Sequence, residues 1–123
     1  MAYVYIGNQK VSPIIIRDYK VVTVSGATPS ITLDNYTVYN AGTLTSLTIN
    51  APSSNIPTDY LVQIDFTSGS TPTVINDNNS IDWAGDNVNE EIGFIPRSNC
   101  KYTLIIFYSN GGLVGNIQGI SIS

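Results

Sequence analysis

Apolar and polar residues alternate along several short stretches of the chain, which is the pattern of a β-strand with one buried face. The alternation is clearest in residues 44–49 and 61–66. Five large apolar side chains share one face of these stretches and are expected to point into the core: Leu47, Ile49, Val62, Ile64 and Phe66. No stretch keeps the period of a helix, although one helical turn is expected around residues 86–91.

Clusters of Gly, Pro, Asn and Ser separate the strand-like stretches and mark the turns between them. Both faces of residues 102–108 are largely apolar, which predicts a strand in the middle of a sheet or one covered on both sides. This spacing predicts an all-β fold, and we expect a single antiparallel β-sandwich, jelly-roll or immunoglobulin-like, with an N-terminal hairpin arm. The predicted strands of the main body are residues 30–33, 36–39, 45–50, 60–67, 73–75, 80–83, 102–108 and 115–121.

The N-terminal residues predict a short hairpin. Residues 3–6 and 9–11 are strand-like and are joined by Gly7-Asn8, a two-residue turn. Because these strands and residues 14–16 are too apolar to remain free in water, we expect them to add to another subunit as strands. The residues expected at this assembly interface are Tyr3, Tyr5, Ile6, Val11, Ile14 and Ile16.

The turn-forming residues 25–29 divide the chain into two parts. Residues 1–24 are expected to form the hairpin and assembly arm, and residues 30–123 are expected to form the β-sandwich body. Neither part contains a convincing internal repeat.

The chain has few charged residues. They make up 11% of its 123 residues, against about 25% in typical globular domains. The polar surface comes instead from 13 Ser, 12 Thr and 13 Asn. Because little charge repulsion keeps such surfaces apart, we expect association with other proteins and a homo-oligomer, for which fibre proteins suggest a trimer by analogy.

Charge and hydropathy argue against two other kinds of partner. A net charge of −4 and five scattered basic residues disfavour nucleic acid, which requires clustered Lys and Arg. No run of roughly 18 apolar residues predicts a membrane span. The first residues also lack the basic start and apolar stretch of a signal peptide, so the chain is expected to be made in the cytoplasm.

Little in the chain predicts catalysis, a cofactor or a metal. The absence of His removes the Ser-His-Asp and Cys-His arrangements and the usual zinc sites. Cys100 is expected to pack at the start of a strand, because its neighbour Lys101 would point to the opposite face. The carboxylates that could form a glycosidase pair are expected to be solvated loop residues: Asp77, Asp82, Asp86, Glu90 and Glu91.

Two features leave ligand binding open. Residues 76–82 are rich in Asn and Asp, but Ile81 stands where a calcium loop of the EF-hand type requires Gly. An irregular calcium site stays open there, while turns stabilised by their own side chains are the expected role. The aromatic residues could stack on sugars, but Trp83 alternates with Ile81 and is expected in the core. The tyrosines expected at the surface are Tyr3, Tyr5, Tyr39 and Tyr60.

Two stretches resemble known proteins. Residues 4–14, VYIGNQKVSPI, resemble the N-terminal hairpin of many small tailed-bacteriophage virion proteins. Residues 60–73 are similar to a segment that recurs in phage tail and head-fibre proteins. An Ile-x-Trp-x-Gly-Asp pattern follows in those proteins, then a Phe-x-Pro, a Tyr-bearing strand and a Gly turn. The matching positions here are residues 81–86, 94–96, 102–108 and 111–112.

The resemblance covers most of residues 1–14 and 44–118 and is a pattern of turns and core aromatic residues. It implies a non-enzymatic structural component of a virion, usually oligomeric, with Trp83 and Phe94 in the core. It leaves open whether the protein decorates the head, forms a head fibre, or belongs to the tail or baseplate. The implied partners are other capsid or tail proteins, and the implied location is the virion.

Three other functions remain open. The principal alternative is a carbohydrate- or receptor-binding module for adhesion to a host surface, which shares the fold class and could bind a glycan. A bacterial surface domain is disfavoured by the lack of a signal peptide. A glycosidase would need a cleft in which two carboxylates face each other.

Overall fold

The computed structural model describes residues 4–6, 9–11 and 18–122. Every regular element in these ranges is a β-strand, so the predicted all-β class is confirmed. The described residues therefore include no helix that could span a membrane. The strands are β1 (Val4–Ile6), β2 (Gln9–Val11), β3 (Lys20–Thr23), β4 (Ser30–Thr32), β5 (Thr37–Thr43), β6 (Ser46–Asn50), β7 (Leu61–Ser68), β8 (Val74–Asn76), β9 (Ile81–Gly85), β10 (Val88–Asn89), β11 (Gly93–Phe94), β12 (Cys100–Ser109) and β13 (Gly112–Ser121).

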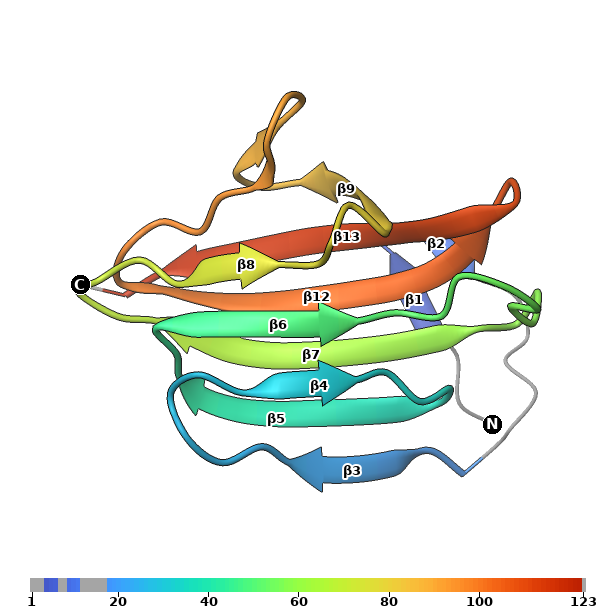
Figure 1. Ribbon diagram of the computed structural model, residues 1–123, viewed down its shortest axis with the longest axis horizontal. Coiled ribbons are helices and arrows are strands. Elements are labelled where there is room, and N and C mark those ends of the chain that lie inside the picture. The colour runs from blue at the N-terminus through green and yellow to red at the C-terminus, as the bar shows by residue number, and fades with distance from the viewer. Residues whose placement is uncertain (1–3, 7–8, 12–17, 123) are drawn as a thin grey trace.

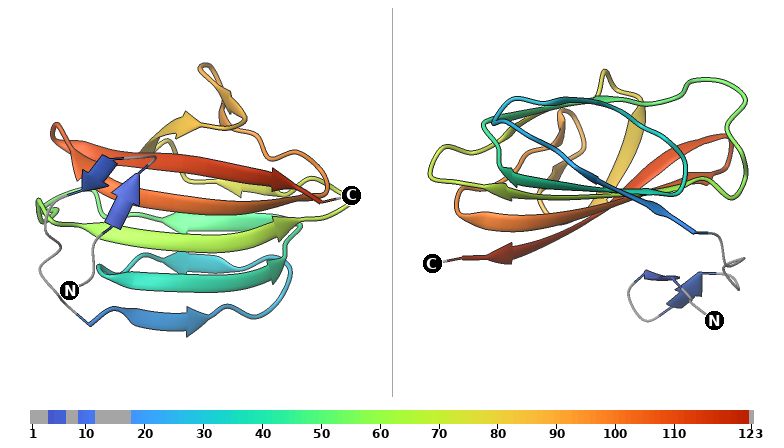
Figure 2. Two further views of the ribbon diagram at one scale, coloured as in Figure 1. Left: turned by 180° about the vertical axis from the view of Figure 1, so that it is seen from behind. Right: turned by 90° about the horizontal axis from the view of Figure 1, so that it is seen from below.

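Two sheets face each other across the core. The larger has six strands in the order β3-β5-β7-β12-β13-β9, and the smaller has three in the order β4-β6-β8. Figure 1 shows the smaller sheet lying over the middle of the larger one, with β3 and β9 at the two edges. Two separate hairpins, β1-β2 and β10-β11, complete the described strands (Figure 2).

From β3 to β8 the chain winds around the core, so that consecutive strands alternate between the two sheets. The chain passes from β3 in the larger sheet to β4 in the smaller, then to β5, β6, β7 and β8 in the same alternation (Figure 1). Two reversals separate each strand from the next in its own sheet, so β3, β5 and β7 are parallel, as are β4, β6 and β8. The three parallel strands of the larger sheet differ in length: β3 has 4 residues, β5 has 7 and β7 has 8. The winding therefore has no repeat of fixed length in the sequence.

The second half adds the antiparallel part of the larger sheet. β12 pairs antiparallel with β7 and with β13, and β9 returns to pair parallel with β13. Asn110 and Gly111, with φ of 50° and 83°, make the tight turn between β12 and β13 that the twist of a hairpin requires. Five of the nine described strand pairings are parallel, so the predicted antiparallel arrangement is wrong for most of the body.

The core lies between the sheets and contains the face that alternation predicted. All five predicted side chains are buried, with exposed fractions between 0 and 2%. Strand β12 occupies the predicted central position, and it buries Tyr102, Leu104 and Ile106 on its inner face. The buried face also includes Ile31, Leu44, Leu113 and Ile117.

Four aromatic rings cluster at the part of the core that β9 and β11 border. The rings of Phe66 and Tyr102 stack with centroids 5.4 Å apart. The ring of Phe94 meets Tyr102 edge-on at 5.1 Å and lies 5.5 Å from the ring of Trp83. Trp83 and Phe94 are therefore core residues, as expected, and their contacts hold the β10-β11 hairpin against the larger sheet, of which β9 is an edge strand.

Most predicted strands are observed, with small shifts at their ends. The helical turn expected around residues 86–91 is wrong, because those residues form β10 and the turns on either side of it. The hairpin predicted in residues 3–11 is observed as β1-β2, with Val4 opposite Val11 and Ile6 opposite Gln9. The division into residues 1–24 and 30–123 remains a prediction, and β3 belongs to the six-stranded sheet through its pairing with β5.

A glycine in β13 makes room for the Trp83 ring. A Cβ at Gly115 would overlap the six-membered ring of Trp83, whereas a Cβ at Gly112 in the same strand would meet nothing within 4 Å. Gly115→Ala is therefore expected to lower the free energy of unfolding by about 1–3 kcal/mol through overpacking. Gly112→Ala is the matched control and should change it by less than about 0.5 kcal/mol. Urea denaturation measures both, and equal effects would contradict this packing.

Candidate functional site

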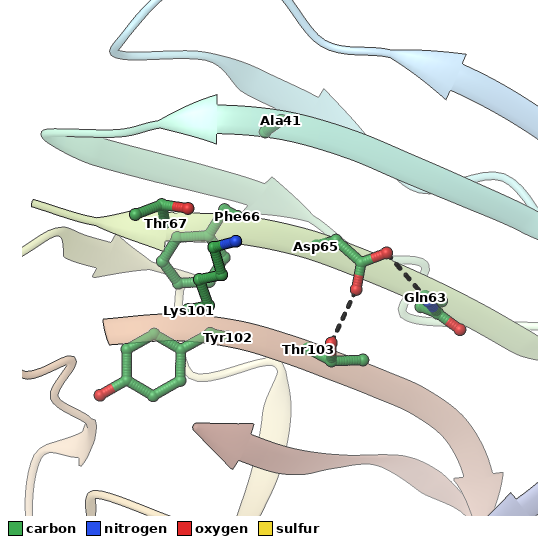
Figure 3. Close-up of a pocket in the computed structure, with 8 residues that line it drawn as sticks. All are labelled: Ala41, Gln63, Asp65, Phe66, Thr67, Lys101, Tyr102 and Thr103. Carbon is green, nitrogen blue, oxygen red and sulfur yellow. Dashed lines mark hydrogen bonds between the residues drawn. The ribbon is translucent and has the colours of Figure 1, made fainter. Parts of the chain in front are cut away.

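The larger sheet carries an open polar groove on the face that points away from the smaller sheet. The groove has a volume of about 360 Å³ and lies across β5, β7 and β12 (Figure 3). The side chains of Val62, Ile64 and Phe66 fill the core, so the alternate residues of β7 face the groove. Its polar lining comes from Gln63, Asp65, Thr67, Lys101 and Thr103.

Asp65 is the centre of a hydrogen-bonded row in this groove. One carboxylate oxygen accepts a hydrogen bond from Thr103 Oγ1 at 2.8 Å, and the other accepts one from Gln63 Nε2 at 2.9 Å (Figure 3). The antiparallel register of β7 and β12 places Asp65 directly opposite Thr103. It also places Thr67 opposite Lys101, which adds an ammonium group to the same surface. The carboxylate is therefore held in one orientation by its neighbours.

The groove is suited to hydrogen bonding and not to acid–base catalysis by paired carboxylates. Asp65 is the one carboxylate among the described residues that line it, whereas a glycosidase requires two. Phe66 and Tyr102 also border the groove, but both are only 2% exposed, because their rings belong to the core cluster. The groove thus offers amide, hydroxyl, carboxylate and ammonium groups without an exposed ring for stacking.

The residues predicted at the assembly interface lie in the N-terminal part of the chain. Tyr5 and Ile6 are in β1, and Val11 is in β2. Tyr3, Ile14 and Ile16 lie outside the described residues. The strands β1 and β2 pair with each other and with no other described strand.

The carboxylates considered for catalysis lie in β9, in the loop before it and in the turns on either side of β10. Asp86 accepts a hydrogen bond from the Gly119 amide at 2.9 Å, and Asp82 lies exposed on β9. Glu90 and Glu91 are exposed in the turn after β10. Residues 18–122 and the two N-terminal strands contain no group of three or more His, Cys, Asp or Glu side chains that could hold a metal ion. Cys100 is buried at the first position of β12, as expected.

The loop considered for calcium stabilises its own turn. Asp77 accepts hydrogen bonds from the Asn79 amide at 3.3 Å and from Trp83 Nε1 at 2.8 Å. Its carbonyl accepts hydrogen bonds from the amide and hydroxyl of Ser80. Asn78 and Asn79 have φ of 54° and 55°, which Asn tolerates better than most residues. The expected turn role of this stretch is therefore confirmed, and it also anchors the buried Trp83.

Two tyrosines expected at the surface are buried, so that prediction is wrong for Tyr39 and Tyr60. They are 5% and 4% exposed. The Tyr39 hydroxyl donates to the Thr32 carbonyl at 3.2 Å and accepts from the Asp34 amide at 2.9 Å, which joins β5 to the end of β4. The buried hydroxyl of Tyr60 has no hydrogen-bond partner among the described residues.

The sequence contained part of the signal for the groove. Gln63, Asp65 and Thr67 alternate with the buried residues of β7, which predicts a polar outer face. The pairing of Asp65 with Thr103 could not be predicted, because the two residues are 38 positions apart and meet only through the register of β7 and β12.

Compared with known proteins, the chain matches no protein-family model, no curated protein and no solved structure.

The buried hydroxyl of Tyr60 predicts a loss of stability at high pH. Burial raises the pKa of Tyr60 from 10.0 to about 12. The unfolded chain loses this proton near pH 10 while the folded chain retains it, so stability is intact below pH 10 and falls between pH 10 and 12. The loss attributable to Tyr60 is at most about 3 kcal/mol, from about 1.4 kcal/mol per pKa unit, and screening by solvent reduces it. Tyr60→Phe should remove it, as measured by urea denaturation at a series of pH values.

The matched control for this prediction is Tyr39→Phe. It removes a hydroxyl with two hydrogen bonds, so it should lower the free energy of unfolding by about 1–3 kcal/mol at pH 7. Tyr60→Phe should have little effect at pH 7. The interpretation fails if the stability of wild type and Tyr60→Phe declines in parallel from pH 10 to 12.

Proposed function

We propose that this chain is a non-enzymatic structural component of a bacteriophage virion, in the head decoration, head fibre or tail. It assembles through its N-terminal strands and displays the body as a single two-layered β-sandwich. The observation that carries the proposal is the hairpin β1-β2, which is a sheet of its own among the described strands.

A hairpin of this size needs a partner to be stable. Each of its strands has three residues, and an isolated two-stranded hairpin is marginally stable in water. Its outer edges carry backbone groups that another strand can pair with. Addition of a strand from a neighbouring subunit supplies those hydrogen bonds, which fits a protein that functions within an assembly.

Composition and sequence pattern support the same function. Charged residues are 11% of the chain, so subunits of this protein can pack closely with little repulsion. The resemblance of residues 4–14 and 60–73 to phage virion proteins supplies the kind of assembly, with other capsid or tail proteins as the partners. Nothing in this function requires a cofactor.

Detection of the chain in purified particles tests the virion function. Tagged full-length chain is supplied in trans to a host strain producing the phage, and density-purified particles are analysed by mass spectrometry. The full-length chain should co-purify with particles. A variant lacking residues 1–17, which keeps every strand from β3 onward, should fold but be at least about tenfold depleted from particles, because its assembly strands are gone. Full-length chain found only in the soluble fraction would refute the proposal.

A second candidate function is binding of a host-surface glycan, and the groove around Asp65 favours it. Asp65, Gln63 and Thr103 present a fixed set of hydrogen-bonding groups of the kind that bind sugar hydroxyls. Because no ring in the groove is exposed for stacking, affinity would rest on these groups alone. A glycan array with the full chain tests this function.

Loss of the carboxylate should reveal whether a glycan binds in the groove. Asp65→Ala should weaken any glycan signal by about tenfold or more, since it removes a charged hydrogen-bonding group. Asp82→Ala, which changes an exposed carboxylate on β9, is the matched control and should leave the signal unchanged. A signal that survives Asp65→Ala would place sugar binding elsewhere.

A further inference from the structure

Strand β3 forms an edge of the six-stranded sheet, and its four residues contain one charge, no Pro and no register shift against β5. All four of its residues are exposed, with Val21 at 58% and Val22 at 37%, and Tyr19, which precedes the strand, is 63% exposed. Edge strands are normally protected by charged side chains, by Pro or by a bulge. In β3 the one charge is Lys20, and its ammonium group is bound to the Asp34 carboxylate.

The backbone of β3 shows which groups are free to pair. The Lys20 amide donates to the Tyr36 carbonyl at 2.9 Å, and the Val24 amide donates to the Asn40 carbonyl at 2.8 Å. Because backbone groups alternate in direction along a strand, those of Val21 and Thr23 point away from β5. Two N–H and two C=O groups therefore face outward along the described edge of the sheet.

We propose that β3 pairs with β3 of a second copy of this chain, antiparallel across a two-fold axis at Val22. In this register Val21 lies opposite Thr23 of the copy, and the two residues exchange both of their backbone hydrogen bonds. The same exchange occurs on the other side of the axis. Four hydrogen bonds form, and the two six-stranded sheets become one continuous sheet of twelve strands.

The side chains of β3 are self-complementary in this register. Val22 lies against Val22 of the copy at a non-hydrogen-bonded position, where side chains are closest. Lys20 lies opposite Val24 of the copy, so no like charges are opposed. A second copy is favoured over an unrelated chain because the three paired residues Val21, Val22 and Thr23 are β-branched and uncharged, so the same residues supply both halves of the pairing.

The opposite edge of the sheet is protected, which favours a closed dimer over a filament. Strand β9 carries the exposed Asp82 and ends at Gly85, which has φ of 107°. Pairing of β3 with β9 of a neighbour would be head-to-tail and would continue indefinitely, whereas β3 with β3 closes after two copies. The dimer is independent of the virion function and stands whether or not the chain enters particles.

Charge substitutions at Val22 test the interface in solution. Sedimentation velocity should show a dimer for the full chain. Val22→Lys and Val22→Glu should each weaken the dimer by about a hundredfold, because like charges would face each other at the axis. An equimolar mixture of the two variants should restore it. Val74→Lys, at an exposed Val on β8, is the control and should remain dimeric.

Disulfide formation tests the register itself. Two antiparallel residues at a non-hydrogen-bonded pair have Cα atoms about 4.5 Å apart, within the range that a disulfide spans. Val22→Cys should therefore give a covalent dimer on mild oxidation. Val21→Cys should not, because Val21 faces Thr23 of the copy and lies too far from its own equivalent. The buried Cys100 leaves the wild-type chain as a control that does not cross-link.

Three results would overturn the proposal. The first is a wild-type chain that is monomeric at about 1 mM, a concentration at which a dimer with a dissociation constant of about 1 mM would already be visible. The second is an oligomer of the same size in Val22→Lys and Val22→Glu. The third is cross-linking of Val21→Cys as efficient as that of Val22→Cys. Circular dichroism of each variant, with melting temperatures within a few degrees of wild type, establishes that loss of the dimer is not loss of the fold.

Discussion

Burial of the inner face of one sheet against the inner face of the other is the interaction on which this structure depends. Leu44, Leu47 and Ile49 meet Ile64, Leu104 and Ile106, and none of the six is more than 1% exposed. Because β4 to β7 alternate between the two sheets, each crossing places one strand's apolar face against a strand of the opposite sheet. A shift of one residue in any of these strands would turn its apolar face outward, so the same contacts also fix the register.

The sequence predicted the strands and the core because both follow from alternation, which is local. It did not predict the pairing. A strand with one buried face has the same period whether its neighbours are parallel or antiparallel, so β5 and β7 gave no sign that they run in the same direction. Tyr39 and Tyr60 were expected at the surface because Tyr is enriched at protein interfaces, whereas the Tyr39 hydroxyl forms hydrogen bonds with Thr32 and Asp34 inside the fold.

The candidate sites also depend partly on local sequence pattern and partly on contacts between residues far apart in the chain. The polar face of β7 is visible in the sequence, but the hydrogen bond from Thr103 to Asp65 depends on the register between strands far apart in the chain. The exposed edge at β3 depends on which strand ends the sheet, and no local pattern contains that information. The role of a residue could therefore be predicted where it depends on which face of its own strand the residue occupies. It could not be predicted where it depends on the order of strands in the sheet.

The pairing of β9 with β13 has a consequence for the order in which the molecule forms. β9 is separated from its partner by β10, β11 and β12, so during synthesis it emerges long before the strand that holds it in the sheet. Trp83, the lone tryptophan, lies in β9 and packs over Gly115 of β13. The packing around its indole is therefore complete only once β13 has paired with β9. The intrinsic fluorescence of Trp83 is accordingly sensitive to whether this edge of the sheet is closed.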